Sequence, residues 1–171
     1  MILWLAGAKV AKPIEEHTNE QLQNVIDNHR RWGQTDAGYY REALAELDRR
    51  KGGGLSFEKS MELIRTAATE GRFLSYKDIA DGSGCDWMKV RYLVNEHLGR
   101  MIEYAHKRGW PMLSAIVVNK QHVEDGGMEP STLKGFVEAA RWLGYNVTDE
   151  RAFLKDQQQR VFDWAKGKDI G

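Results

Sequence analysis

The segment from Phe73 to Asn119 constrains the fold of this chain more than any other. Its residues predict a short helix, a Gly-Ser-Gly turn, a second amphipathic helix, a further helical segment and then a β-branched strand. That order is typical of a winged helix-turn-helix, in which the first helix and the turn hold the second helix so that its exposed face enters the major groove. We therefore expect a mainly α fold of the α+β kind, with a winged helix-turn-helix-like core, an N-terminal helical hairpin and C-terminal helices.

The N-terminal part predicts two antiparallel helices. Thr18 and Gln21 have the spacing of a capping box, and Gly33 ends the helix that they begin. A second helix is expected from position 35 or 36 to about Arg50. The connection between the two helices is short, and a short connection joins near neighbours, so the pair is expected to form an αα-hairpin.

Three successive glycines at 52–54, after Lys51, mark the clearest flexible joint, because glycine is the most entropically costly residue to order. We predict a domain boundary there, although a long loop between helices is the open alternative. The expected parts are an N-terminal segment and helical hairpin over 1–51, a winged-helix-like core over 55–147 and a C-terminal helix over 148–171.

The remaining elements are predicted from caps, periodicity and glycine stops. Between residues 86 and 109 one long bent helix and two helices divided at Gly99 are both consistent with the sequence. A run of strand length follows at 113–118, then a polar loop at 119–130. The predicted N-caps are Ser56, Ser75, Asp86, Ser131 and Thr148, and the predicted stops include Gly71, Gly109, Gly144 and Gly167.

Charge and cysteine content limit the functional classes. The chain has 25 basic and 25 acidic residues, so it lacks the global positive charge typical of nucleic-acid binders, and a phosphate-binding face would have to be local. One cysteine, Cys85, permits no intramolecular disulfide, which favours a reducing cytoplasm. The apolar run at the start is far shorter than the roughly 18 residues of a spanning helix, so no signal peptide and no membrane association are expected; an upstream extension or an edge strand is the alternative for it.

The predicted recognition helix runs from Asp86 to about Leu98 and carries Arg91 and Asn95 four residues apart. Arginine suits guanine edges and asparagine suits adenine edges. Residues 86–109 include five basic and three acidic side chains. So small a positive surplus is explained equally well by an ordinary solvated helix surface and by contact with nucleic acid. The candidate nucleic-acid-binding residues are Tyr76, Lys77, Lys89, Arg91, Tyr92, Asn95, Arg100 and Lys120.

A family resemblance covers the same segment. The phrases YKDIA at 76–80, VRYLVNEHL at 90–98 and WPML at 110–113, with the strand at 114–119, resemble the DNA-binding domain of the alkylguanine-DNA alkyltransferases and alkyltransferase-like proteins. The resemblance implies that Tyr76 and Arg91 occupy the family's tyrosine and arginine positions, where the arginine pushes into the duplex. The phrases FLSYKDIA and IVVNK also resemble uncharacterised bacterial proteins, which implies no activity.

The chain departs from the active family in its reactive motif. The family's Pro-Cys-His-Arg is replaced by the run from Leu113 to Val118, which has neither cysteine nor histidine. Alkyl transfer requires a thiolate activated by a neighbouring base, so no such activity is expected. Cys85 is not a substitute, because it lies in the predicted turn between helices.

The expected function is that of a non-enzymatic protein that binds nucleic acid, double-stranded DNA in particular, as a regulator or accessory factor. The five histidines show no metal-ligand spacing, and no phosphate loop or nucleophile elbow is present, so no catalytic residue, metal or cofactor is predicted. The alternative is a protein-protein interaction module, an inhibitor or adaptor, that docks a protein partner or forms a homodimer. Zero net charge and the aromatic residues Tyr39, Trp142 and Trp164 favour that alternative.

Overall fold

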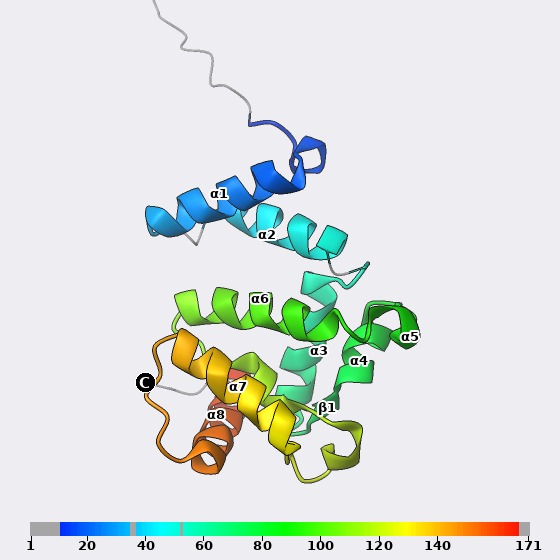
Figure 1. Ribbon diagram of the computed structural model, residues 1–171, viewed down its shortest axis with the longest axis vertical. Helices are drawn as coiled ribbons and strands as arrows, with labels where there is room; N and C mark the ends of the chain where they lie inside the picture. The colour runs from blue at the N-terminus through cyan, green and yellow to red at the C-terminus, as the bar shows by residue number, and fades with distance from the viewer. Residues whose placement is uncertain (1–10, 35–36, 52, 168–171) are drawn as a thin grey trace, which may run out of the picture. The chain divides into compact units, whose positions relative to one another are not determined.

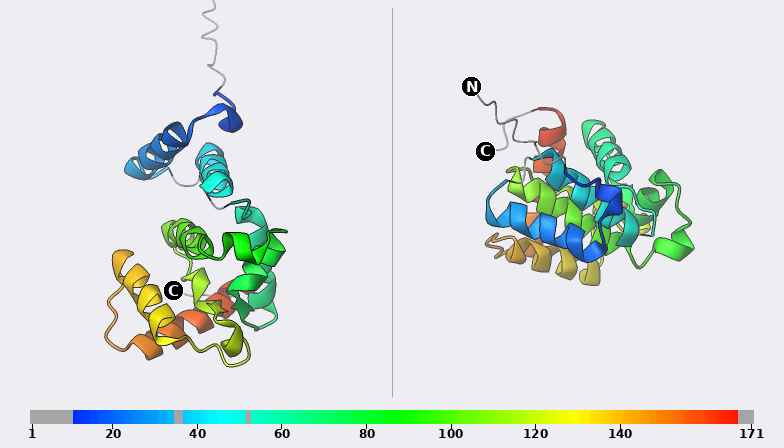
Figure 2. Two further views of the ribbon diagram at one scale, coloured as in Figure 1. Left: turned by 45° about the vertical axis from the view of Figure 1, so that its right-hand side comes forward. Right: turned by 90° about the horizontal axis from the view of Figure 1, so that it is seen from above.

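The structure, a computed structural model, describes residues 11–34, 37–51 and 53–167. These residues form eight α-helices, three short 3-10 helices and one sheet of two strands, so the fold is mainly α as expected (Figures 1 and 2). The α-helices are α1 (Asn19–Arg31), α2 (Gly38–Lys51), α3 (Phe57–Thr69), α4 (Tyr76–Gly82), α5 (Trp87–Val90), α6 (Val94–Lys107), α7 (Pro130–Trp142) and α8 (Glu150–Ala165). The 3-10 helices are η1 (Ile14–Glu16), η2 (Leu113–Ile116) and η3 (Lys120–His122), and the strands are β1 (Leu74–Ser75) and β2 (Val117–Val118).

The chain divides into two compact units, residues 1–46 and 47–171, and the division falls inside α2. In the first unit the predicted capping box is present: Thr18 Oγ1 accepts from Gln21 N at 3.1 Å, and Gln21 Oε1 accepts from Thr18 N at 2.9 Å. The ring of His29 on α1 lies 6.0 Å from that of Tyr40 on α2. The predicted start of α2 at 35 or 36 and the opening segment before residue 11 lie outside the described residues.

The core of the second unit is built around η2. Helices α3, α6 and α8 pack against it, and α3 also packs against α8. Their core side chains include Met101 of α6 and Val161 of α8, which are fully buried. Consequently α8 belongs to the same compact unit as the predicted core. Within the described ranges, no helix combines the length and apolar character needed to cross a bilayer.

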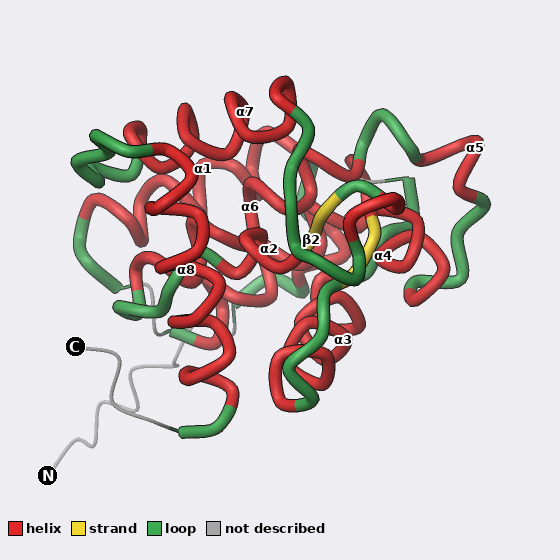
Figure 3. The backbone as a smooth tube through the Cα atoms, turned by 90° about the horizontal axis from the view of Figure 1, so that it is seen from below, coloured by secondary structure: helices red, strands yellow, loops and turns green. Residues whose placement is uncertain are grey.

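The predicted strand over 113–118 is mostly wrong. Residues 113–116 form η2, and only Val117–Val118 is extended, pairing in parallel with Leu74–Ser75 (Figure 3). Buried glutamines of α8 supply the hydrogen bonds that a strand would take from a neighbour: Gln157 Oε1 accepts from Met112 N at 3.0 Å, and Gln158 Nε2 donates to Ala115 O at 3.0 Å. The described residues contain no antiparallel hairpin that would serve as a wing, so the winged-helix assignment stays a prediction.

The predicted recognition helix over 86–98 is interrupted. Helix α5 ends at Val90, and α6 begins at Val94 after a turn, so the break does not lie at Gly99, which is inside α6. The side chains of Val90 and Leu93 flank Gly53, where an added Cβ would lie 3.0 Å from Leu93 Cδ1. The close packing of Val90 and Leu93 against Gly53 thus favours a turn at this point. Helix α6 continues past Gly99 because burial of its apolar face outweighs the low helix propensity of glycine.

The predicted N-caps at Ser56, Ser75 and Asp86 are present. The predicted caps at Ser131 and Thr148 are wrong by two residues and one residue, respectively. Helix α7 begins at Pro130 and has no side-chain cap, and α8 is capped by Asp149, whose Oδ1 accepts from Ala152 N at 3.0 Å. Helices α3 and α7 end just before glycines with positive φ, as the predicted stops require.

Candidate nucleic-acid interface

A pocket of about 510 Å³ in the second unit brings together three of the predicted site residues. Tyr76 comes from the first position of α4, Arg91 from the turn after α5 and Asn95 from the first turn of α6. Side chains that were not predicted as site residues complete the lining; they include Trp87, Ser114, Asn119, Ser131 and Phe136. The pocket therefore combines aromatic faces with hydroxyl and amide groups.

A capping box positions Tyr76. Ser75 Oγ accepts from Asp78 N at 3.1 Å, and Asp78 Oδ2 accepts from Ser75 N at 2.8 Å, which fixes the first turn of α4. Burial raises the pKa of Tyr76 to about 12. The phenol of Tyr76 therefore remains neutral at physiological pH and keeps its hydrogen-bond donor.

Arg91 and Asn95 are both exposed, but they do not share one continuous helix as expected. Asp86 caps α5 by accepting from Met88 N at 3.0 Å, and Arg91 N donates to Trp87 O at 2.9 Å, so the backbone is held up to Arg91. Helix α6 then restarts three residues later. Both side chains nevertheless line the same pocket.

Four further predicted residues are exposed but do not line the pocket. Lys89 is on α5, Tyr92 is in the turn after it, and Lys120 is in η3, next to the pocket residue Asn119. Lys77 on α4 forms an ion pair with Asp81 at 2.7 Å, and this hydrogen bond raises the pKa of Lys77. The positive charge of Lys77 is therefore already paired with a carboxylate at the surface.

Arg100 is placed differently from the prediction. Its side chain is 12% exposed, and Nε donates to Asp48 Oδ1 at 2.5 Å. A second ion pair joins its Nη1 to Glu96 Oε1 at 3.0 Å. Because both carboxylates already engage this guanidinium, we leave Arg100 out of the proposed interface.

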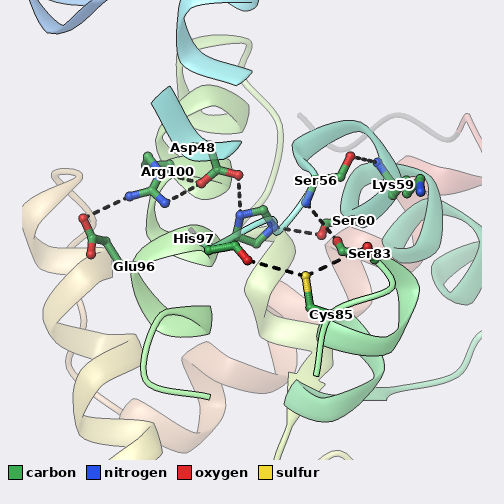
Figure 4. Close-up of polar contacts among 10 residues, drawn as sticks. Asp48, Ser56, Lys59, Ser60, Ser83, Cys85, Glu96, His97 and Arg100 are labelled. Atoms are coloured by element: carbon green, nitrogen blue, oxygen red, sulfur yellow. Dashed lines mark hydrogen bonds and ion pairs between the residues drawn. The ribbon is translucent and has the colours of Figure 1, made fainter. Parts of the chain in front are cut away.

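A second polar cluster, which the sequence analysis missed, lies in the interior (Figure 4). Its members are Asp48 at the end of α2, Ser60 on α3, and His97 and Arg100 on α6. His97 Nε2 lies 2.8 Å from Ser60 Oγ, and His97 Nδ1 is in close contact with Asp48 Oδ2. Among the described residues neither of the last two atoms has a hydrogen-bond partner of standard geometry, so this close contact is the polar interaction that the two share.

This order of hydroxyl, imidazole and carboxylate is also the order found in serine hydrolases. In the tautomer that directs the Nδ1 proton at Asp48, the Nε2 atom accepts from the Ser60 hydroxyl. However, Ser60 is 1% exposed, and Asp48 and His97 have no exposed surface. A substrate cannot reach the hydroxyl in this structure, so we interpret the cluster as a structural network that joins α2, α3 and α6.

A sequence signal for this network exists in retrospect. Ser60, His97 and Asp48 each interrupt the apolar face of an amphipathic helix, and buried polar side chains normally have partners. Their spacing along the chain gives no indication that they pair with one another. The contact is created by the packing of three helices that are far apart in sequence.

The single cysteine is not activated. Cys85 is half-buried, and burial raises its pKa, an effect that nearby Lys59 opposes only in part. Its Sγ lies 3.9 Å from Ser83 O and 4.0 Å from Gly53 O. The thiol is therefore mainly protonated at neutral pH and makes a poor nucleophile.

Within the described part of the chain, no group of three or more His, Cys, Asp or Glu residues is placed to hold a metal ion. No family model, no curated protein and no solved structure matches the chain.

Proposed function

We propose that this protein binds double-stranded DNA through the surface around Tyr76, Arg91 and Asn95, and that it acts as a non-enzymatic regulator or accessory factor. The observation that carries the proposal is the meeting of these three side chains at one pocket, although they come from three separate elements. Arginine and asparagine are suited to base edges, and Lys89 and Lys120 are exposed cations that suit phosphates.

The lining of the pocket supports a nucleic-acid ligand. Tyr76, Trp87 and Phe136 offer aromatic surface, and Asn95 and Asn119 offer amide donors and acceptors. A planar heteroaromatic base is recognised by this combination of stacking and edge hydrogen bonds. The pocket is thus chemically matched to DNA even though the chain has no net charge.

The resemblance to the alkyltransferase-like proteins supports the same proposal. The positions that it assigns, Tyr76 and Arg91, lie at this pocket, and so does Ser114 in the run that corresponds to the reactive motif. Neither cysteine nor histidine is present in that run. We therefore propose binding without alkyl transfer.

Fluorescence anisotropy of labelled duplex and single-stranded DNA tests the proposal. For an interface that neutralises about three phosphates, raising the salt concentration from about 50 to about 200 mM should weaken duplex binding about 40-fold. Arg91→Ala should weaken it about tenfold more than the matched control Arg151→Ala, which removes an exposed arginine from α8. Equal affinities for wild type and Arg91→Ala at both salt concentrations would show that the interface is wrongly assigned.

A protein-protein interaction module is the second candidate, and exposed Trp142 on α7 favours it. The other aromatic residues expected to be exposed are less so: Tyr39 donates its hydroxyl proton to Lys12 O at 2.9 Å, and Trp164 is buried. A stable complex that persists in high salt, and that Trp142→Ala dissociates, would support this candidate over DNA binding.

A further inference from the structure

A second pocket lies in the second unit and shares no lining residue with the pocket of the proposed DNA interface. Its volume is about 350 Å³, which is within the range of small-molecule sites. Helices α6 and α7 both end at the left of Figure 1, and residues 109–111 and 145–146, which follow them, line the pocket together with α8. Helix α6 has 14 residues and is therefore about 21 Å long, and Asn95 lies near its other end, so the two pockets are separate.

Aromatic side chains form the apolar part of the lining. They are Trp110 after α6, Tyr145 after α7 and Phe153 on α8, and all three are half-buried. The rings of Tyr145 and Phe153 meet edge to face, with their centroids 5.4 Å apart and their planes at 64°. These rings offer a fixed apolar surface to a ligand side chain.

One face of α8 supplies the polar part of the lining. Phe153, Asp156, Gln157 and Arg160 recur at intervals of three and four residues, which places them on one side of the helix. Arg160 Nε donates to Asp156 Oδ2 at 2.7 Å, and the two side chains are 42% and 55% exposed, so a ligand can reach both. Burial raises the pKa of Tyr145, while the charge of Arg160 lowers this pKa and that of Asp156 raises it, so the ion pair lies close to the phenol.

Gln157 adds a hydrogen-bond donor to the pocket. Its side chain is 3% exposed, and its Oε1 accepts from Met112 N at 3.0 Å. Among the described residues no acceptor is found for its Nε2, which retains some contact with solvent. Because buried amide donors normally have a partner, an acceptor on a bound ligand would complete the hydrogen bonding of this side chain.

We propose that this pocket binds a free amino acid with an apolar side chain, in its zwitterionic form. The ligand ammonium binds Asp156, the ligand carboxylate binds Arg160 and accepts from Gln157 Nε2, and the ligand side chain packs against the three aromatic rings. A cationic ligand is opposed by Arg160 and an anionic ligand by Asp156, whereas a zwitterion complements both charges. This site requires no DNA binding and is additional to the proposed interface.

The charge requirement is tested with ligand derivatives. The full chain is titrated by isothermal calorimetry with L-phenylalanine, with N-acetyl-L-phenylalanine, which lacks the ammonium, and with L-phenylalaninamide, which lacks the carboxylate. L-phenylalanine should bind, and each derivative should bind at least about tenfold more weakly, because each loses one charge-assisted pair. Glycine keeps both charges but has no apolar side chain, so it should also bind at least about tenfold more weakly.

Two variants assign each ligand charge to its partner. Asp156→Asn should weaken phenylalanine binding about tenfold and should remove the penalty on the N-acetyl derivative but not that on the amide; Arg160→Gln should do the reverse. An exposed ion pair contributes little to stability, so both variants should unfold at the wild-type temperature. The control Glu150→Gln removes an exposed carboxylate of α8 that does not line the pocket, and it should bind phenylalanine as wild type does.

Several results would overturn the proposal. Absence of binding by phenylalanine, leucine and tryptophan at millimolar concentration is one, and equal affinities for phenylalanine and its two derivatives are another. Tighter binding of phenethylamine, which has only the ammonium, would indicate a cation-binding aromatic cage instead. Unchanged phenylalanine binding in both variants would place the ligand elsewhere. None of these results bears on duplex DNA binding, which is measured separately.

Discussion

His97 Nε2 lies 2.8 Å from Ser60 Oγ, and solvent reaches neither residue. Two helices, α3 and α6, are joined by this contact, and Asp48 on α2 completes the network from the other side of the imidazole. A buried carboxylate is tolerated only when donors surround it, and here the donors are His97 and Arg100. Removal of a buried member of this network is therefore expected to destabilise the fold more than removal of an exposed ionic partner.

Asp48→Ala should lower the free energy of unfolding by about 3 to 5 kcal/mol, because it leaves a largely buried arginine and a fully buried histidine without their shared partner. Glu96→Ala is the matched control, since it removes the other carboxylate that contacts the same Arg100 but is 61% exposed, and it should cost less than about 1 kcal/mol. Urea unfolding measures both values. Similar losses for the two variants would mean that the buried carboxylate has no special role.

Ser60 should resist covalent labelling despite its hydrolase-like partners. An active-site-directed fluorophosphonate requires direct access to the serine Oγ, and Ser60 is 1% exposed. Mass spectrometry of the native protein after incubation should show no adduct. An adduct that disappears in both Ser60→Ala and His97→Gln would contradict our structural interpretation and would indicate an enzyme that opens in solution.

Gly126→Ala should destabilise the fold strongly. Gly126 has a φ of +74°, and an added Cβ would lie 2.3 Å from Phe73 Cζ, so left-handed strain and overlap act together. We expect a loss of about 2 to 4 kcal/mol. Gly84→Ala is the control with a similar φ of +70° but no atom within 4 Å of the new methyl group, and its loss should be about 1 kcal/mol. Thermal unfolding compares the two, and equal losses would show that the Phe73 contact is unimportant.

Tyr76 should make the fold sensitive to alkali. Its pKa is about 12 in the folded protein and 10.0 without burial, so the unfolded chain loses this proton first. The contribution of the neutral Tyr76 phenol to the free energy of unfolding is fully present below pH 10 and is lost as the pH rises to about 12. This contribution is at most about 3 kcal/mol. Tyr76→Phe should flatten this decline in urea unfolding between about pH 9 and pH 12. Tyr92→Phe, which removes a phenol that solvent already reaches, should not alter it.

The local elements of this fold could largely be predicted from the sequence. Caps at Thr18, Ser56 and Ser75 depend on hydrogen bonds within three residues, and glycine stops depend on the φ of one residue, so neighbours along the chain decide them. The turn between α4 and α5 was correctly placed, and three of the eight predicted site residues line one pocket. The bending of the chain at Arg91 was not predicted.

Tertiary packing decided the features that local rules could not. The β-branched run at 113–118 has the propensity of a strand, yet residues 113–116 form η2, and Gln157 and Gln158 of α8 bond the backbone at Met112 and Ala115. Likewise, Asp48, Ser60 and His97 become one network only when α2, α3 and α6 are packed together. The sequence by itself determined several helix caps and glycine stops and which helix faces are apolar, because these follow from interactions over a few residues. Only the tertiary structure decided which buried polar groups meet, because hydrogen bonds between distant segments depend on packing that no local pattern records.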